Sequence, residues 1–212
     1  MCGRFTLRAD GNALAQHFEL DEARFPPPRF NIAPTQAIPV VRLSPDGGRR
    51  ELALLRWGLV PPWAKPGEPL PALFNARAET LDSKPAFRAA FRARRCLIPA
   101  DGFYEWKPAD GKKQPWFVHR RGDGLFAFAG LWEGESCTIV TTAPTPQLQP
   151  LHDRMPAFTP PEHYAAWLDP APRPPAARLA LLRPPDDLEL YPVGLQVNRA
   201  GYDGPECVAP TA

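Results

Sequence analysis

Cys2 directly follows the initiator methionine, and its residue type gives this position distinctive chemistry. Because its side chain is small, we expect Met1 to be removed, which makes Cys2 the N-terminal residue. Its α-amine, with a pKa of about 7.7–8.0, can condense with an aldehyde to an imine, and its thiol can then close a thiazolidine ring. Alternatively, the thiol can act as an N-terminal nucleophile with the amine as its base. The dipeptide alone favours a third interpretation, in which Cys2 is a small buried apolar residue.

Three further segments carry side chains suited to binding or proton transfer. Asn75 and Arg77, in FNARAET, offer an amide with donors and an acceptor and a guanidinium that fits phosphate. Glu105 lies between aromatic residues in GFYEWK, where burial would raise the pKa of its carboxyl into the range useful for proton transfer. His152, in LHDRMP, is an acid–base candidate. Each segment also has a simpler interpretation. Asn75 and Arg77 can belong to a polar loop, Glu105 to a strand with one solvated face, and His152 to an exposed loop.

The composition excludes several classes of protein. The four cysteines, at positions 2, 96, 137 and 207, form no CxxC pair and have no histidine near them, so neither a zinc site nor a disulfide framework is expected. Lys and Arg number 25 against 23 Asp and Glu, and the net charge of +2 gives no large field that attracts polyanions. There is no apolar run of about 18 residues and no signal-peptide pattern. We therefore expect a cytoplasmic protein without a metal or a membrane span.

The elements that position these residues must be short. Proline makes up 30 of the 212 residues, well above the usual share of roughly 5%, and each proline removes a backbone donor. This excludes a helical bundle and predicts an α+β fold in a single domain, residues 1–212, with mainly antiparallel strands around a barrel-like core and a few short helices. Helices are expected at 11–20, 84–94 and 162–168, and strands at 37–43, 51–57, 96–99, 103–107, 116–119, 125–131, 137–142 and 188–193.

The helix expected at 84–94 has two different faces. Phe87 and Phe91 share one face, while Arg88, Arg92 and Arg95 are assigned to the other, with Ser83 as a candidate cap. The arginine face can serve as a surface for nucleic acid, although a solvated helix face is the favoured interpretation.

Taken together, these segments resemble the SOS-response-associated peptidase (SRAP) domain proteins, which process abasic sites in DNA. The resemblance covers nearly the whole chain, and its segments occur in the order of the family. They are MCGRF (1–5), RFNIAPTQ (29–36), WGLVPPWA (57–64), FNARAET (74–80), CLIPADGFYEWK (96–107), TTAP (141–144), LHDRMP (151–156) and GLQVNRAGYDGPEC (194–207).

The resemblance implies a covalent reaction with damaged DNA. Family members bind single-stranded DNA, or junctions of single and double strands, and form a thiazolidine between the N-terminal cysteine and the aldehyde of the ring-opened abasic sugar. On this chain Cys2 is then the nucleophile, Asn75 orients its amine, and Glu105 and His152 move protons. Lyase activity through the imine and reversal of the crosslink are also implied.

Binding of the DNA is assigned to two kinds of residue. Arg4 and Arg77 are expected to hold the phosphates that flank the lesion, and Trp57 and Trp63 are candidates for stacking on bases. For both tryptophans, a place in the core is the equally weighted alternative. We expect a monomer that needs no cofactor.

Two other classes of function remain open at this point. One is a cysteine peptidase or N-terminal-nucleophile hydrolase, as the family name suggests, which would turn over amide substrates. The other is a non-catalytic module for single-stranded DNA, which would bind undamaged DNA without forming an adduct.

Overall fold

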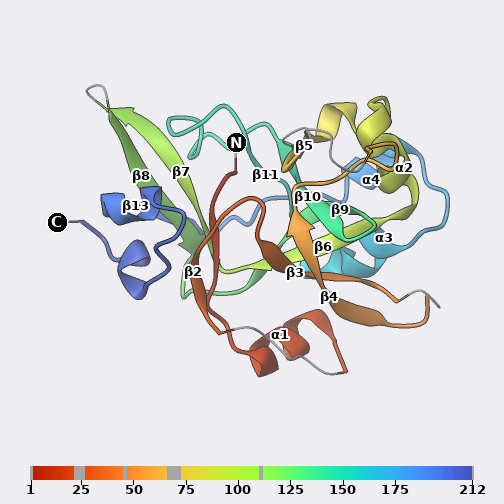
Figure 1. The fold of residues 1–212 in the computed structure, drawn as a ribbon, viewed down its shortest axis with the longest axis horizontal. Coiled ribbons are helices and arrows are strands. Elements are labelled where there is room, and N and C mark those ends of the chain that lie inside the picture. Colours follow the sequence, from red (N-terminus) through yellow and green to blue (C-terminus); the bar gives the residue numbers. More distant parts are fainter. Residues whose placement is uncertain (1, 22–26, 45–46, 66–72, 110–111, 212) are drawn as a thin grey trace.

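The computed structural model describes residues 2–21, 27–44, 47–65, 73–109 and 112–211 (Figure 1). Its α-helices are α1 (Gly11–Phe18), α2 (Pro85–Ala93), α3 (Tyr164–Leu168) and α4 (Pro175–Leu179). Its 3₁₀ turns are η1 (Ala78–Thr80), η2 (Pro161–His163), η3 (Leu195–Asn198) and η4 (Pro205–Val208). Within these residues no helix is both long and apolar enough to cross a membrane.

One sheet has the strand order β13-β8-β7-β1-β2, and every neighbouring pair in it is antiparallel. Its strands are β1 (Phe5–Leu7), β2 (Arg29–Ile32), β7 (Gly102–Ala109), β8 (Lys112–Arg120) and β13 (Leu188–Pro192). The long hairpin of β7 and β8 projects at the upper left of Figure 1. Because β1 lies between β7 and β2, the start of the chain is held inside the sheet.

The second sheet has the order β11-β10-β4-β3-β6-β9-β12, and a further pairing of β9 with β10 closes five of its strands into a ring. Its strands are β3 (Ala37–Leu43), β4 (Arg50–Trp57), β6 (Arg95–Ala100), β9 (Phe126–Glu133), β10 (Ser136–Thr142), β11 (Met155–Pro156) and β12 (Phe158–Thr159). A short strand, β5 (Asn75–Arg77), pairs with β10. Only the pairs β10–β4 and β10–β5 are parallel among the described strands. The expected α+β fold with a barrel-like core of mainly antiparallel strands is confirmed.

Phenylalanine rings from both sheets meet in the core. Phe5 on β1 and Phe103 on β7 each lie edge-on to Phe128 on β9, with ring centroids 5.9 Å apart, and Phe128 lies 5.5 Å from Phe158 on β12. All four side chains are buried. Burial of one such ring contributes about 1.5–3 kcal/mol, so this cluster fixes the first sheet, and with it the chain start, against the ring.

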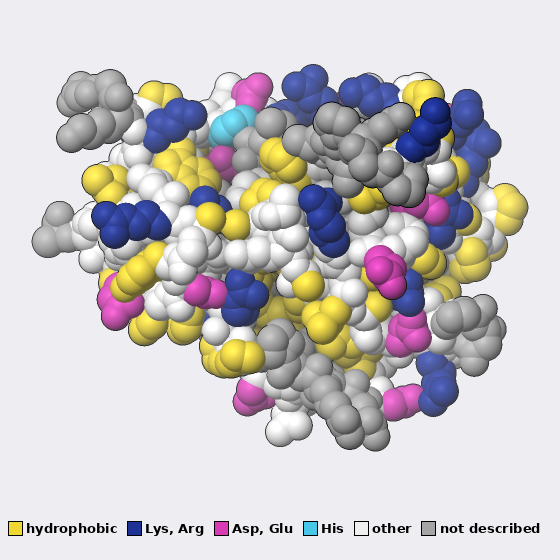
Figure 2. All heavy atoms as spheres, viewed as in Figure 1, with side chains coloured by type: hydrophobic (Ala, Val, Ile, Leu, Met, Phe, Trp, Pro, Cys, Tyr) yellow, Lys and Arg dark blue, Asp and Glu magenta, His cyan; other side chains and the backbone are white. Residues whose placement is uncertain are grey.

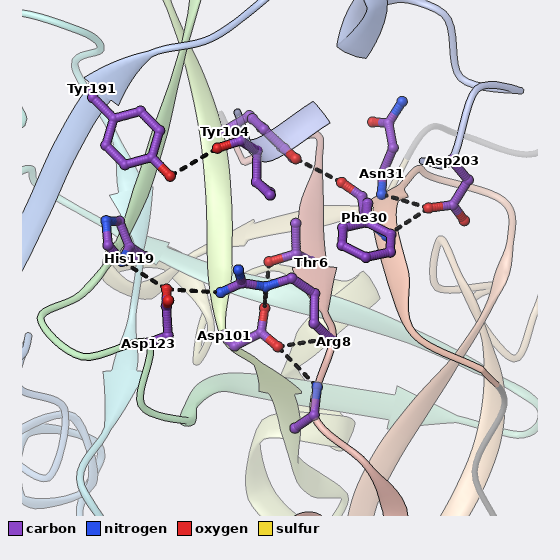
Figure 3. Close-up of polar contacts among 12 residues, drawn as sticks. Thr6, Arg8, Phe30, Asn31, Asp101, Tyr104, His119, Asp123, Tyr191 and Asp203 are labelled. Atoms are coloured by element: carbon purple, nitrogen blue, oxygen red, sulfur yellow. Dashed lines mark hydrogen bonds and ion pairs between the residues drawn. The ribbon is translucent and has the colours of Figure 1, made fainter. Parts of the chain in front are cut away.

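Asp101 in the β6–β7 turn anchors the end of β1 (Figure 3). The Thr6 hydroxyl donates to Asp101 Oδ1 at 2.5 Å, Arg8 Nε donates to the same oxygen at 3.0 Å, and the backbone N–H groups of Arg8 and Ala9 donate to Oδ2. A buried carboxylate satisfied by this many donors holds its partners rigidly. The strand that follows Cys2 therefore has a fixed position.

The expected helices are present, with corrections at their ends. The helix predicted at 84–94 is α2, but its N-cap is Lys84, with no side-chain cap hydrogen bond, rather than Ser83. The assignment of Arg95 to the arginine face is wrong, because Arg95 belongs to β6 and is buried. Arg95 donates to the carbonyl oxygens of Phe91 and Trp167, which are helix-end acceptors without partners in their own helices.

Candidate functional site

Cys2 lies just before β1 and is fully buried. Its Sγ lies 4.0 Å from the carbonyl oxygen of Arg4. Burial raises the pKa of the thiol far above its usual value, and the charge of Glu105 adds to this shift. The thiol is therefore neutral at physiological pH and requires a proton acceptor, or an electrophile already activated beside it, before its sulfur can react.

Asn75 is placed against Cys2 by the parallel pairing of β5 with β10. Its Nδ2 donates to the carbonyl oxygen of Cys2 at 2.8 Å. Its Oδ1 is buried and has no hydrogen-bond partner among the residues that the structure describes. Leaving a buried acceptor unpaired costs about 1–3 kcal/mol, so this oxygen is suited to accept a hydrogen from a ligand or from the amine of Cys2.

Glu105 lies on β7 opposite Trp116 of β8 and is only 2% exposed. Burial raises the pKa of its carboxyl from 4.5 to about 7. The aromatic neighbours in the sequence predicted such a rise, and it is confirmed. At neutral pH this carboxyl exists in both protonation states, as a group that alternately gives and takes a proton requires.

His152 lies in the loop between β10 and β11, and about one third of its side chain is exposed. Its Nδ1 lies 3.0 Å from the backbone N of Arg154 and 2.7 Å from Asp153 Oδ1. A neutral ring accepts from the Arg154 N–H, whereas a protonated ring donates to Asp153. Burial lowers the pKa of His152, with Asp153 opposing this shift, which favours the neutral form with its hydrogen on Nε2.

A cavity of about 690 Å³ brings several of these side chains together. Arg4, Glu105 and His152 lie on its wall, so the structure unites three residues that are distant in the sequence. Sequence reasoning missed the remaining wall, which consists of Trp106, Lys113, Leu195 and Asn198. Trp106, Leu195 and Asn198 fall within segments that resemble the family and Lys113 does not, and no local pattern distinguishes any of the four as cavity residues.

Arg4 and Arg77 have different settings. Arg4 Nη1 donates to Asn31 Oδ1 at 3.0 Å and to the carbonyl oxygen of Val197, so part of its guanidinium is held by the protein. Arg77 follows Asn75 on β5 and is exposed. Asn31, which sequence reasoning also missed, is fully buried and donates to three carbonyl oxygens of the C-terminal segment.

The two candidate stacking residues differ sharply in exposure. Trp57 is fully buried, its Nε1 donates to the carbonyl oxygen of Phe74, and its ring lies edge-on to Phe5 at 5.3 Å. Trp57 is thus a core residue, which corrects the expectation that it stacks on bases. Trp63 is 57% exposed, so it remains a candidate for stacking on a base.

The chain is similar in sequence to known proteins over most of its length. The family model described as SOS response associated peptidase (SRAP) matches residues 1–200. The chain is 41% identical over 225 residues to the abasic site processing protein YoqW of Bacillus subtilis (strain 168), covering 98% of this chain and 99% of that protein. It is 33% identical over 230 residues to the abasic site processing protein HMCES of Gallus gallus, covering 90% and 68%.

Solved structures share the fold. A crystal structure of a protein from Bacteroides thetaiotaomicron matches with a TM-score of 0.79 at 22% identity, over the full length of both chains. A phage-related protein from Bordetella bronchiseptica matches with a TM-score of 0.75 at 29% identity, covering 92% of this chain and 95% of that one.

Proposed function

The chain belongs to the SOS response associated peptidase (SRAP) family, and on this basis we propose that it processes abasic sites in DNA by forming a covalent bond through Cys2. The observation that carries the proposal is the placement of Cys2, which is held by Asn75 and lies beside a carboxyl whose pKa is near neutrality. The partner is single-stranded DNA, or a junction of single and double strands, that contains the lesion.

The proposed reaction needs only Cys2, the sugar aldehyde and groups that transfer protons. Removal of Met1 frees the α-amine of Cys2, which adds to the aldehyde carbon of the ring-opened sugar to give a carbinolamine. Loss of water from the carbinolamine gives an imine, and this step needs an acid for the departing hydroxyl. The sulfur then adds to the imine carbon, the thiol proton moves to nitrogen, and a thiazolidine results.

Glu105 and His152 share the proton transfers of this sequence. A carboxyl with a pKa of about 7 can protonate the ring oxygen of the closed sugar or the departing hydroxyl, and it can accept a proton at the next step. A neutral His152 can take the proton of the thiol, which burial keeps on the sulfur.

Asn75 is the positioning residue in this scheme. Its Nδ2 already holds the carbonyl oxygen of Cys2, and its buried Oδ1 is available to an N–H of the new N-terminal amine. Both ends of the Asn75 amide then act on the same residue, so the amine and the thiol approach the sugar in one orientation.

Contacts with the flanking DNA are assigned to exposed groups. Arg77, two residues after Asn75, binds a phosphate next to the lesion, and Arg4 contributes the part of its guanidinium that faces the cavity. Trp63 stacks on a base, which is tolerant of sequence and therefore suits a protein that recognises damage.

A thiol protease is the weaker alternative. A cysteine peptidase works through a thiolate whose pKa is lowered by a neighbouring cation, whereas the pKa of the Cys2 thiol is raised. Turnover of amide substrates by the purified protein would favour this alternative.

The test is denaturing electrophoresis with an oligonucleotide that carries one abasic site. The mature protein is expected to give a stable adduct, and a form with a blocked N-terminus, which retains the thiol but has no free amine at Cys2, is expected to give none. Cys2→Ser keeps the amine and is expected to lose the durable adduct while still giving an imine that borohydride traps. A stable adduct from the blocked form would overturn the mechanism.

A further inference from the structure

One side of α2 presents a row of positive charges. Lys84, at the N-cap, is followed at intervals of four residues by Arg88 and Arg92, and all three are exposed. The opposite face buries Phe87 and Phe91 against the core. Residues four apart on a helix lie one above the other, about 6 Å apart along the axis. The three long cations therefore form a linear stripe.

This stripe belongs to a strongly basic part of the chain. Residues 75–95 contain six Lys and Arg against two acidic residues, whereas the whole chain has a net charge of only +2. Figure 2 shows Lys and Arg side chains gathered along the upper right edge, over β5 and α2 as placed in Figure 1. The near-neutral chain thus concentrates its positive charge beside the element that carries Asn75.

The two acidic residues of this region do not neutralise the stripe. Glu79 is bound on both carboxylate oxygens by Arg154, at 2.8 and 2.9 Å. Asp82 reaches only the far end of the stripe, at 3.5 Å from Arg92. Lys84 and Arg88 have no carboxylate within 4 Å among the described residues, so both charges are available to a partner.

The stripe is continuous with the candidate site. Asn75 holds the carbonyl oxygen of Cys2, Arg77 is exposed at the end of the same strand, and η1 leads from there to α2. The Lys84 N–H donates to the Thr80 carbonyl oxygen at 3.0 Å, which fixes this short connection. Arg77 thus lies two residues from the amide that holds Cys2, and the cations of α2 follow it along the chain.

We propose that Arg77, Lys84, Arg88 and Arg92 form a track that binds successive phosphates of the single strand on one side of the lesion. The proposal rests on the proposed function, because that function places the abasic sugar at Cys2. The contacts are with the backbone and not with bases, so the track adds affinity without sequence preference. It also makes the protein sensitive to how much single strand extends on that side.

The test compares Lys84→Gln/Arg88→Gln with a control that loses the same charge elsewhere, Arg49→Gln/Arg121→Gln. Arg49 precedes β4 and Arg121 follows β8, both outside the stripe. Binding to undamaged single-stranded DNA is measured across salt concentrations. Each phosphate contact contributes about 0.7 to the slope of log K against log salt for single strands, so the stripe variant is expected to lose about 1.4 and the control much less.

Adduct formation gives the second readout. Abasic oligonucleotides carry a long single-stranded arm on the 5′ side, on the 3′ side or on neither. The wild type is expected to gain rate from one of the two arms at low protein concentration, and the stripe variant to lose that gain while reacting normally with the short substrate. Equal slopes and equal arm effects in the stripe variant and the control would overturn the track. Failure of the proposed function would look different, since the wild type would then form no adduct on any substrate while the salt slopes still report on the track.

Discussion

Burial of Glu105 raises the pKa of its carboxyl, which suits the proposed proton transfers but lowers the stability of the fold at neutral pH. Its pKa lies at about 7 in the folded protein, against 4.5 for the exposed group. Below pH 4.5 the group is protonated in both states and costs nothing. As pH rises from 4.5 to 7 the unfolded chain ionises first, so stability falls, and above pH 7 the full cost of about 3 kcal/mol remains.

Glu105→Gln is therefore expected to unfold less readily than the wild type at pH 8, by up to about 3 kcal/mol, and to match it near pH 4. Urea unfolding at the two pH values measures this difference. The same variant is expected to form adduct slowly and to lose the change in rate near pH 7. Equal stability of the two proteins at pH 8 would contradict the raised pKa.

Asn75 fixes the position of Cys2 through its side-chain amide. Asn75→Ala removes the hydrogen bond to the Cys2 carbonyl oxygen, which frees the reactive residue to move, and the rate of adduct formation is expected to fall roughly tenfold or more. Asn198→Ala is the matched control, because it removes an amide from the cavity wall without touching Cys2. Time courses of adduct formation together with DNA-binding anisotropy separate loss of orientation from loss of affinity. Wild-type rates in Asn75→Ala would exclude the positioning role.

The residue types by themselves indicate part of this chemistry. Aromatic neighbours predict the raised pKa of Glu105, because strand alternation next to apolar side chains implies desolvation. Nothing local predicts Asn31, whose partners lie some 170 residues away in the chain. A buried amide that satisfies distant carbonyl groups has no sequence signature, because its role exists only after the chain has folded.

At the level of the elements, Trp57 at the end of β4 is buried and Trp63 in the following loop is exposed, so we expect them to have different roles. Trp63→Ala is expected to weaken binding of single-stranded DNA by roughly 1–3 kcal/mol with little change in unfolding. Trp57→Ala is expected to cost about 3–5 kcal/mol of stability, because it empties a fully buried site. Anisotropy and urea unfolding on both variants measure the contrast. Equal loss of DNA affinity in both, at equal stability, would contradict it.

Arg95 and Arg88 are expected to differ in their contribution to the stability of the fold. Arg95 donates to carbonyl oxygens at the ends of α2 and α3, and Arg95→Met leaves these acceptors buried and unpaired. A loss of about 3 kcal/mol is expected, whereas exposed Arg88→Met is expected to change stability by no more than about 0.5 kcal/mol. Chemical unfolding of the two variants measures this difference. An unchanged free energy of unfolding in Arg95→Met would show that these carbonyl groups find other hydrogen-bond donors.

The same residue shows where element prediction from sequence fails. The spacing of Phe87 and Phe91 correctly predicts the buried face of α2, because helical periodicity is a local property. The helix ends at Ala93, however, and strand β6 turns Arg95 into the core. Its position depends on α3, which is about 70 residues away and cannot be read from the arginine spacing.

At the scale of the whole molecule, the C-terminal segment is attached to β2 by Asp203. The Asp203 carboxylate accepts from the backbone N–H groups of Phe30 and Asn31 (Figure 3). It also pairs with Arg29. Asp203→Asn is expected to lower stability by about 1–3 kcal/mol and to speed amide hydrogen exchange at Phe30 and Asn31. Exchange followed by NMR measures this, with amides of β6 as internal reference. Unchanged exchange at both positions would show that the segment is held without Asp203.

The closed ring could be expected from the sequence only as a class of fold. Short strands and many prolines favour a barrel-like core, but the pairings of β10 with β9, β4 and β5 determine the closure. Two of these three pairings are parallel and join strands far apart in the chain. Turn signals predict only hairpins between neighbouring strands, so this part of the topology required the structure.

The placement of the chain start between β7 and β2 has a consequence for biosynthesis. Arg4 is bound by Asn31 and by the carbonyl oxygen of Val197, 193 residues later. Domains assemble as their chain leaves the ribosome from its N-terminus onward, but here Arg4, just before β1, meets its acceptor at Val197 only after 193 further residues have been made. Under the proposed mechanism, the start of the nascent chain then stays accessible for removal of Met1 until Leu195 and Asn198 complete the cavity wall that also contains Glu105 and His152. If Cys2 reacts as proposed, the order of synthesis restricts the reaction to chains that extend past Asn198.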